Sequence, residues 1–219
     1  MAGERVTVLY GPYGSGKTEI AVNYAVWLAG RAAGVWLADL DLVTPYFRVR
    51  DLRDRVGRRG VRVVAPEGPP GEGDLPVLPP GLSGLLRGDG PGVVDVGGGD
   101  TGARVLGTLH TLAGDCRLWL VFNPYRPGCD SPAGLVDMAR RISASSRLGP
   151  AGVVSNPHLG PATTVPVVAR GHAVVEQAAA RLGLPVVLLT ALQDIAPAVE
   201  KMVGREVFPL QRYLTLPWE

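Results

Sequence analysis

Residues 11–18 read Gly-Pro-Tyr-Gly-Ser-Gly-Lys-Thr, and they decide the fold because they fit the pattern G-x-x-x-x-G-K-T in full. The apolar run VTVLY precedes this stretch and the helix-forming run TEIAVNYAVWLAG follows it, which is the strand–loop–helix setting that the pattern requires. Glycines let backbone N–H groups converge on phosphate oxygens, and the helix N-terminus adds partial positive charge. Lys17 is expected to reach the β- and γ-phosphates and Thr18 to hold Mg²⁺. A glycine-rich turn without a ligand is the alternative interpretation.

Strand-like apolar runs recur along the chain, with helical patterns between them. The runs are continuous rather than alternating, as expected for strands that are buried on both faces. Strands are predicted at 5–10, 35–40, 61–65, 92–96, 118–122, 152–155 and 185–190. Helices are predicted at 18–31, 101–113, 132–147, 172–182 and 195–203. This alternation predicts a three-layer α/β fold of the P-loop NTPase type, whose mostly parallel central sheet of about seven strands carries helices on both faces.

The composition is that of one globular domain spanning residues 1–219. A hydrophobic fraction of 46% and a charged fraction of 19% are enough to build a core and exclude disorder as the main state. No apolar run approaches the roughly 18 residues of a membrane span, and Glu4 and Arg5 stand where a signal peptide would turn apolar. We therefore expect a cytoplasmic protein without membrane attachment.

Acidic residues end two of the other predicted strands. One strand closes on Asp39 and Asp41, and another carries Asp95 before a run of glycines that includes Gly98. Ligands of open α/β sheets bind at the carboxyl edge of the strands, where these residues fall. Asp95 is expected to hold Mg²⁺ through water, Gly98 to approach a γ-phosphate, and Asp41 to orient the attacking water. Asp39 has either a structural or a functional role, and a capping carboxylate is the alternative for Asp95.

Two of the three asparagines, Asn123 and Asn156, directly follow apolar runs. An amide offers a donor and an acceptor together, which suits the edge of a purine base. The N-K-x-D pattern that is typical of GTP-binding proteins is missing after both residues, so ATP is favoured as the cofactor, together with Mg²⁺. Asparagine before proline also forms turns, and this remains the alternative for each residue.

The candidate site follows from these motifs. The residues expected to bind the nucleotide are Gly11, Pro12, Tyr13, Gly14, Ser15, Gly16, Lys17, Thr18, Gly98 and Asn156. The catalytic residues are Lys17 and Asp41, and the residues at the metal are Thr18 and Asp95.

Four segments, GPYGSGKT, ADLDLVTPYFR, VVDVGGGDTGA and VVSNPHL, together resemble the MinD/ParA and CobB/CobQ-type P-loop ATPases. This group also holds dethiobiotin synthetase and the nitrogenase iron protein, and the similarity covers roughly residues 4–205 in the same order. The resemblance implies a parallel-sheet ATPase that binds Mg-ATP and often dimerises around it. Under it, Lys17, Thr18, Asp41, Asp95 and Asn156 match the positions for phosphate, magnesium, water, magnesium and adenine respectively.

One position departs from the MinD/ParA pattern. Members of that group carry an extra lysine after the first glycine of the loop, which reaches the phosphates of the partner subunit, and Pro12 stands there in this chain. A dimer of that kind needs another cation, for which Arg48 and Arg50 are candidates because a positioned arginine stabilises transition-state charge.

The segment 48–62 holds seven arginines, with an apolar stripe of Val49, Leu52 and Val56. A solvated amphipathic helix accounts for most of this pattern. A phosphate-rich partner such as nucleic acid is the weaker alternative.

Two further segments lack regular patterns. Residues 66–92 contain seven prolines and are expected to form a long surface connection with one short helix near 82–87, or else a loop that docks a partner. The end of the chain reads FPLQRYLTLPWE and has no helical face, so we expect no membrane-binding helix there. Its apolar side chains, Tyr213, Leu214, Leu216 and Trp218, are expected to pack within the subunit or against a second one.

Cysteine and histidine give no metal pattern. Cys116 is expected to begin a buried strand as a small apolar residue, and Cys129 lies in a loop, so an iron–sulfur cluster shared between subunits is not favoured. His110, His158 and His172 have no ligand spacing.

Three functions remain open. The favoured one is a slow Mg-ATPase that switches between nucleotide states toward a protein partner or a second copy of the chain. The alternatives are an ATP-dependent ligase, synthetase or kinase for a small molecule, for which only 66–92 offers an insert, and a protein that holds ATP without hydrolysing it.

Overall fold

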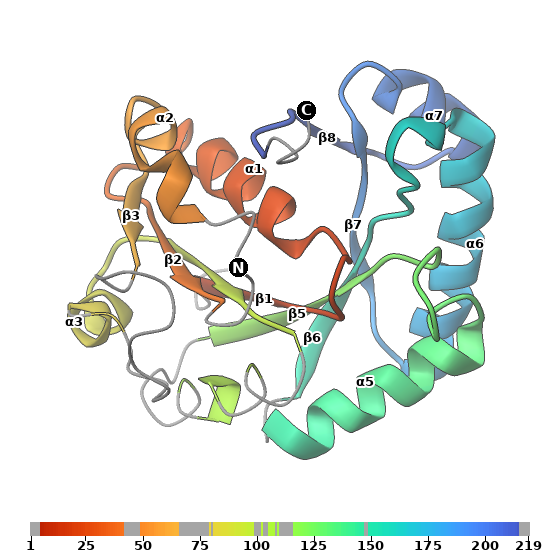
Figure 1. Cartoon of the computed structure of the whole chain (residues 1–219), viewed down its shortest axis with the longest axis horizontal. Helices are drawn as coiled ribbons and strands as arrows, with labels where there is room; N and C mark the ends of the chain where they lie inside the picture. Colours follow the sequence, from red (N-terminus) through yellow and green to blue (C-terminus); the bar gives the residue numbers. More distant parts are fainter. Residues whose placement is uncertain are drawn as a thin grey trace.

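The computed structural model describes residues 5–41, 49–65, 79, 81–98, 102, 105–107, 109, 116–146 and 149–214. Its centre is one sheet of eight strands in the order β3-β2-β4-β1-β5-β6-β7-β8, and all neighbouring strands are parallel (Figure 1). The strands are β1 (Val6–Tyr10), β2 (Trp36–Leu40), β3 (Arg62–Val64), β4 (Gly92–Val96), β5 (Cys116–Phe122), β6 (Pro150–Ser155), β7 (Val186–Leu192) and β8 (Phe208–Leu210).

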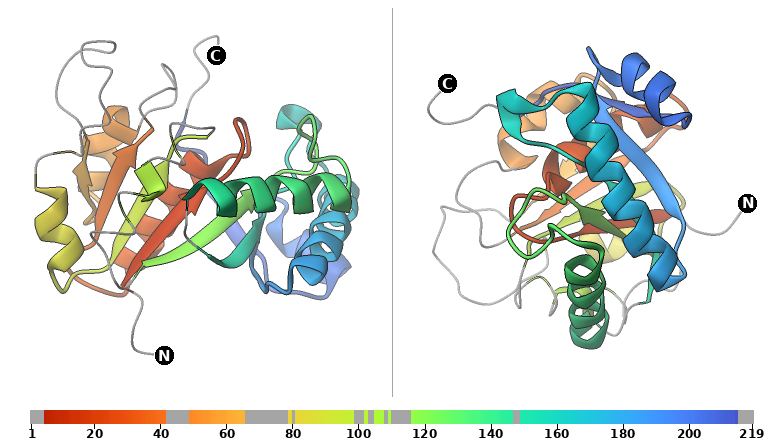
Figure 2. Two further views of the ribbon diagram at one scale, coloured as in Figure 1. Left: turned by 90° about the horizontal axis from the view of Figure 1, so that it is seen from below. Right: turned by 90° about the vertical axis from the view of Figure 1, so that its right-hand side faces the viewer.

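Helices cover both faces of this sheet and give the fold three layers (Figures 1 and 2). They are α1 (Lys17–Ala29), α2 (Arg53–Gly57), α3 (Leu82–Arg87), α5 (Pro132–Ser146), α6 (Val165–Leu182) and α7 (Ala196–Val203). The apolar sides of α1 and α2 pack on one face of the sheet, and those of α3, α5 and α6 pack on the other. Helices α6 and α7 enclose a third cluster against β7.

The continuous apolar runs account for the sheet. All five residues of β1, β2 and β4 are buried, because helices lie on both sides of these strands. Alternate residues of a strand therefore pack against different helical layers. Leu9 packs with α1 on one face, whereas Val8 and Tyr10 belong to the cluster on the other.

The predicted α/β fold is confirmed, and each predicted strand is present within a few residues. The sheet has one strand more than the predicted seven, because β8 at Phe208–Leu210 was not anticipated. Helix α6 begins at Val165 rather than at 172, with Pro166 in its first turn, where a missing N–H costs no hydrogen bond.

Other predictions fall partly outside the described residues. The short helix near 82–87 is present as α3, but most of the proline-rich segment, 66–78 and 80, lies outside. Of the predicted helix at 101–113, the structure describes 102, 105–107 and 109, all in helical conformation. Among the described helices, none is long and apolar enough to cross a membrane.

The parallel arrangement determines where a site can lie. Because the strands run the same way, the loops that follow β1, β2, β4, β5, β6 and β7 all leave the sheet at one edge. The residues singled out from the sequence lie in the last residues of these strands or directly after them, so they gather near that edge.

Candidate functional site

The loop between β1 and α1 has the backbone of a phosphate-binding loop. Gly16 has φ of +85°, a left-handed conformation that other residues rarely adopt, and it is the N-terminal cap of α1. The Ser15 N–H donates to the Pro12 carbonyl at 3.1 Å, and the Ile20 N–H donates to the Gly16 carbonyl at 3.1 Å. The turn thus leads directly into the first turn of the helix, whose N–H groups have no acceptor within the helix itself and can bind an anion.

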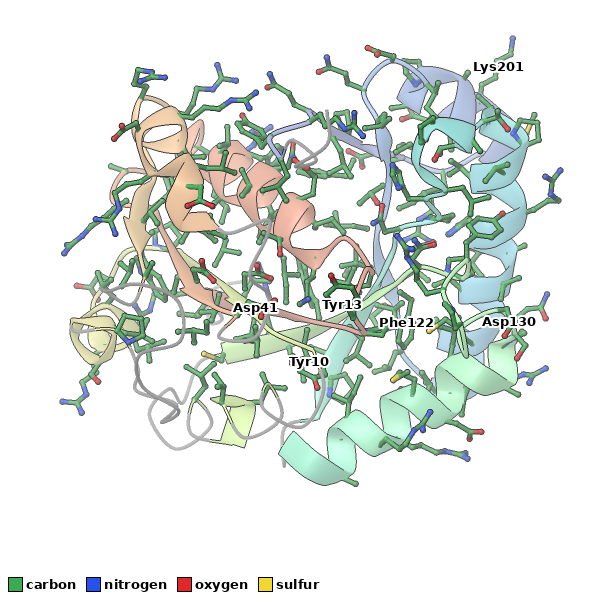
Figure 3. The ribbon with its side chains drawn as sticks, viewed as in Figure 1. Tyr10, Tyr13, Asp41, Phe122, Asp130 and Lys201 are labelled. Carbon is green, nitrogen blue, oxygen red and sulfur yellow. The ribbon has the colours of Figure 1, made fainter. Side chains whose placement is uncertain are left out.

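Lys17 and Asp41 form a buried ion pair beside this loop. The Lys17 Nζ lies 3.7 Å from Asp41 Oδ2, and both side chains are more than 90% buried. Asp41 follows β2, and its N–H donates to Asp39 Oδ1 at 3.1 Å. This contact gives Asp39 a structural role in shaping the end of the strand. Asp41 and Tyr13, which belongs to the loop, are labelled at the edge of the sheet in Figure 3.

Asp95 is fully buried at the same edge. It pairs in register with Leu9 on β1 and with Asp39 on β2. Burial raises the pKa of Asp95 to about 7; Asp39 and Asp41 act in the same direction, whereas Lys17 and the hydroxyl of Thr18 oppose it. Neither carboxylate oxygen has a hydrogen bond of ordinary geometry from another described residue. A buried carboxylate with so little compensation is either protonated or paired with a cation.

The surroundings of Asp95 fit Mg²⁺. This ion takes oxygen ligands, often one or two protein groups with water and phosphate oxygens. The Thr18 hydroxyl and the Asp95 carboxylate are such oxygens, and they lie close enough for Thr18 to influence the pKa of Asp95. The sequence prediction for these two residues is therefore compatible with their placement.

Gly98 lies directly against the phosphate-binding loop. A Cβ at this position would be 3.1 Å from the Gly11 carbonyl oxygen and 3.2 Å from the Tyr13 nitrogen. A side chain here would be crowded by the loop backbone, so the absence of a side chain at Gly98 lets the chain after β4 lie directly against the loop. Residues 99 and 100 lie outside the described residues.

Asn156 ties the end of β6 to the loop. Its Nδ2 donates to the Ser15 carbonyl at 2.8 Å, and its Oδ1 accepts from the Thr190 hydroxyl at 2.8 Å. The amide nitrogen carries two hydrogens, so Asn156 can still donate one to a ligand. Asn123 has a turn-forming role: its Oδ1 accepts from two backbone N–H groups and its Nδ2 donates to the His158 carbonyl at 2.8 Å.

These residues open into one cleft of about 410 Å³. Its lining comprises Tyr13, Gly14, Gly16, Lys17, Thr18, Glu19, Asp41, Asn123, Arg126, Asn156, His158, Leu192, Leu210, Arg212 and Leu214. Of the residues singled out from the sequence, Tyr13, Gly14, Gly16, Lys17, Thr18, Asp41 and Asn156 line this cleft. Gly11, Pro12, Ser15, Asp95 and Gly98, which were also predicted, are not among its lining residues.

Sequence reasoning missed several lining residues. Arg126, in the loop after β5, donates from Nε to the Gly14 carbonyl at 2.8 Å. Burial lowers the pKa of His158, and the nearby charges of Arg126 and Arg212 lower it further. The cleft therefore carries several positive groups besides Lys17. Arg126 follows a strand end of the same sheet edge, which is the one signal in the sequence that could have indicated it.

The remaining candidates lie elsewhere or outside the described residues. Cys116 begins β5 as predicted, and Cys129 is buried in a loop. Val49 and Val56 are buried and Leu52 packs beside them, which confirms the apolar stripe, while Arg48 and the Arg50 side chain lie outside. Tyr213 is buried within the subunit; Leu216, Trp218 and His110 lie outside the described residues.

The fold is similar to that of a solved signal recognition particle protein and of solved FtsY proteins. The 54 kDa signal recognition particle protein from Aeropyrum pernix K1, solved with GDP, matches 84% of this chain with a TM-score of 0.54 and 21% identity. Chloroplast FtsY from Physcomitrella patens matches 85% of this chain with a TM-score of 0.55 and 16% identity. FtsY from Mycoplasma mycoides matches 84% of this chain with a TM-score of 0.53 and 12% identity. At these identities the likeness concerns the fold, which is that of a P-loop NTPase.

The chain accounts for 40% of the length of the Aeropyrum protein and for 58–59% of the two FtsY chains. No family model matches the sequence, and no curated protein is significantly similar to it.

Proposed function

We propose that this chain is a Mg-ATP-binding switch that hydrolyses the nucleotide slowly. The observation that carries the proposal is that Lys17, Thr18 and Asp41 line one cleft beside a glycine-rich loop and all interact with the buried carboxylate of Asp95. Such an arrangement offers backbone N–H groups and an ammonium group for phosphates and hard oxygens for a divalent cation. Membership of the MinD/ParA and CobB/CobQ-type group is part of the proposal.

The base end of the cleft supports adenine. Recognition of guanine through an N-K-x-D motif requires a carboxylate three residues after the asparagine, and Leu159 stands there with 42% of its surface exposed. The carboxylates that line the cleft are otherwise engaged: Glu19 accepts two backbone hydrogen bonds, and Asp41 pairs with Lys17. GDP in the Aeropyrum structure is a property of that protein, and the lining of this cleft favours ATP.

The ion pair of Lys17 and Asp41 suggests how binding prepares hydrolysis. A γ-phosphate would compete with Asp41 for the Lys17 ammonium group, and the carboxylate would then become available to accept a hydrogen bond from the attacking water. Bound Mg²⁺, held by Thr18 and through water by Asp95, would neutralise charge on the phosphates.

The output of the switch is proposed to be association with a protein partner or with a second copy of the chain. Pro12 replaces the lysine that reaches across the dimer in MinD/ParA proteins. Arg48 and Arg50 precede α2 and are the candidates for a cation that a second subunit would supply.

Binding of Mg-ATP to the wild-type chain and to Lys17→Ala, measured by calorimetry, tests the proposal. We expect tight binding that Lys17→Ala abolishes. Lys201→Ala is the matched control, since the only other lysine of the chain lies on α7, far from Asp41 and Tyr13 (Figure 3). Unchanged affinity in Lys17→Ala would refute the assignment of the loop.

Light scattering with Mg-ADP and with a non-hydrolysable ATP analogue tests the output. A dimer that forms only with the analogue supports the switch. A mass that does not respond to either nucleotide would remove the dimerising form of the proposal.

A further inference from the structure

The four residues after β8, 211–214, cross helix α1 and are named the C-terminal strap. Asn23 on α1 holds Gln211 through two hydrogen bonds: its Nδ2 donates to the Gln211 carbonyl at 2.9 Å, and its Oδ1 accepts from the Gln211 N–H at 2.8 Å. Because the Asn23 amide pairs with both backbone groups of Gln211, it fixes the position and the direction of the strap at this residue. The strap therefore begins at a defined place on the helix.

Glu19 holds the far end of the strap. Its carboxylate accepts from the Tyr213 N–H at 2.7 Å and from the Leu214 N–H at 3.2 Å. Glu19 is the residue after Thr18, in the first turn of α1. The strap is thus attached one residue away from the candidate magnesium site.

Arg55 joins the strap to a second helix. Its guanidinium donates to the Tyr213 carbonyl at 2.9 Å and to the Arg212 carbonyl at 3.1 Å, and it lies 4.5 Å from the centre of the Tyr213 ring. Arg55 belongs to α2, which follows the segment 42–48 after Asp41. The strap is therefore bound to both helices on this face of the sheet.

The hydrogen bonds use backbone groups of the strap, and two of its residues line the cleft. Leu214 and Arg212 do so together with Leu192 and Leu210 from the ends of β7 and β8. The three leucines form an apolar part of the lining. Phosphates need N–H groups and cations, which the loop and Lys17 provide, whereas the flat face of a purine suits an apolar wall.

We propose that the C-terminal strap is the base-side wall of the nucleotide cleft, and that Glu19, Asn23 and Arg55 are positioning residues that hold this wall. The inference rests on the proposed function and adds the part of the ligand that the strap recognises. It also makes affinity for the base depend on α2, because Arg55 connects that helix to the wall.

The experiment compares Mg-ATP with Mg-tripolyphosphate, which has the phosphates of ATP but neither base nor ribose. Binding of both is measured by calorimetry for the wild type, Arg55→Ala and Leu214→Ala. Arg58→Ala is the matched control, because Arg58 ends the same helix with an exposed side chain. We expect the first two variants to bind Mg-ATP about tenfold more weakly, as for the loss of one well-packed apolar contact, with tripolyphosphate binding unchanged.

Two substitutions of Glu19 distinguish a role in positioning the strap from general damage to the fold. Glu19→Ala loses both acceptors, while Glu19→Gln keeps one acceptor oxygen, so the ratio of ATP to tripolyphosphate affinity is expected to fall in Ala and to fall less in Gln. A merely structural role would lower both affinities together.

The two proposals fail in different ways. A wild-type chain that binds neither ligand refutes the proposed function. A wild-type chain that binds both ligands equally well refutes the wall and leaves the phosphate site intact. Strap variants that lose both affinities in parallel, or neither, also refute the wall.

Discussion

Asn156 at the end of β6 donates from Nδ2 to the Ser15 carbonyl 2.8 Å away, so one amide closes the loop onto a strand that lies 141 residues further along the chain. Thr190 on β7 holds the other amide atom at 2.8 Å, which prevents the side chain from rotating. The backbone of the phosphate-binding loop is thus supported from two strands that contribute no residue to it. The position of Asn156 beside Gly16 makes it both a support and a candidate ligand for the base.

Replacing Asn156 with Ala is expected to weaken both the fold and the binding of ATP. The Ser15 carbonyl loses its donor in a buried position, which costs about 1–3 kcal/mol of unfolding free energy. Affinity for Mg-ATP is expected to fall about tenfold or more, measured by calorimetry beside denaturant unfolding. Thr190→Val, which keeps the bond to Ser15, is expected to show a smaller loss of affinity. Equal losses in the two variants would contradict this order.

Asp41 is expected to be needed for turnover and not for binding. Asp41→Asn removes the charge that pairs with Lys17 at 3.7 Å, which leaves the ammonium group to the phosphates. We expect the affinity for Mg-ATP to stay equal or to rise. The rate of single-turnover hydrolysis is expected to fall about 100-fold or more, because about 100-fold is the lower end of the rate loss when a general acid or base is removed.

The control for this variant is Asp130→Asn, because Asp130 lies exposed in the loop after β5. It should change neither quantity. Full hydrolytic activity in Asp41→Asn would remove Asp41 from the mechanism.

The residues that we assign to the phosphates follow mostly from local patterns. The spacing within GPYGSGKT places Lys17 and Thr18 at a helix start whatever the rest of the chain does, since only neighbouring residues are involved. Asp95 could be predicted because it lies in a continuous apolar strand, where a carboxylate is costly without a function. Asn156 could be predicted from its place after a strand.

The base end depends on contacts between distant parts of the chain, which no local pattern records. Arg126 meets Gly14 across 112 residues, and Asn23 meets Gln211 across 188. Strand β8 is only three residues long and contains Pro209, so its own propensity is weak; it forms because it can pair with β7 at the edge of the sheet. The position of the strap after β8 could not be predicted either, because it also depends on contacts with distant residues.

Arg126 is expected to contribute to affinity through the loop. Arg126→Ala removes the hydrogen bond to the Gly14 carbonyl and one positive charge from the cleft. Since the side chain is exposed, the bond is worth about 1 kcal/mol, which corresponds to about fivefold in the affinity for Mg-ATP. Arg126→Lys, which can still donate, is expected to recover part of the loss. Arg140→Ala on α5, also exposed, is the control, and a loss of the same size there would exclude a specific role for Arg126.

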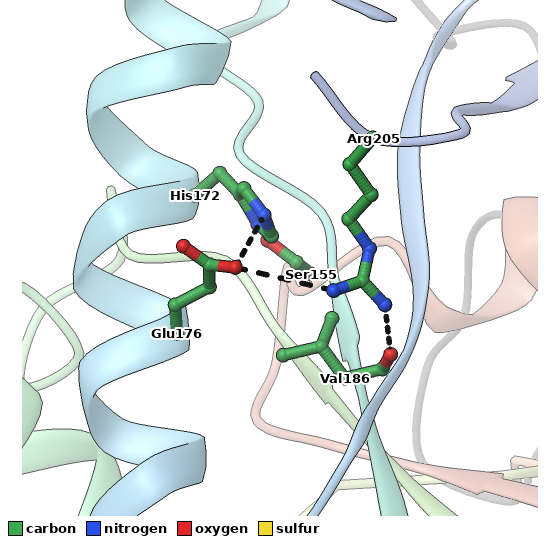
Figure 4. A network of polar contacts seen from close by, with 5 residues as sticks. All are labelled: Ser155, His172, Glu176, Val186 and Arg205. Atoms are coloured by element: carbon green, nitrogen blue, oxygen red, sulfur yellow. Dashed lines mark hydrogen bonds and ion pairs between the residues drawn. The ribbon is translucent and has the colours of Figure 1, made fainter. Parts of the chain in front are cut away.

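A polar network that connects α6 with Ser155 at the end of β6 is expected to make stability depend on pH (Figure 4). His172 on α6 is only 1% exposed; its Nδ1 lies 3.0 Å from the Ser155 hydroxyl and its Nε2 lies 3.4 Å from Glu176 Oε1. Arg205 lies 3.9 Å from the same carboxylate oxygen and also donates to the Val186 carbonyl. Burial lowers the pKa of His172 and Arg205 lowers it further, while Glu176 acts in the opposite direction.

The direction of this pH dependence follows from the protonation of His172 in the folded and in the unfolded chain. Below the ordinary histidine pKa of about 6.5, the unfolded chain binds a proton that folded His172 still refuses. Its contribution to stability is therefore present above that pH and is lost as the pH falls toward the lowered pKa of the folded state. Removing the histidine must then cost less at pH 5.5 than at pH 7.5.

Denaturant unfolding of wild type and His172→Gln at both pH values measures this difference. Glu176→Gln is expected to deepen the loss of stability in acid, because it removes the charge that favours protonated His172. Glu206→Gln, an exposed residue, is the control and should follow the wild type. A cost of His172→Gln that is the same at both pH values would show that the imidazole does not titrate differently in the folded chain.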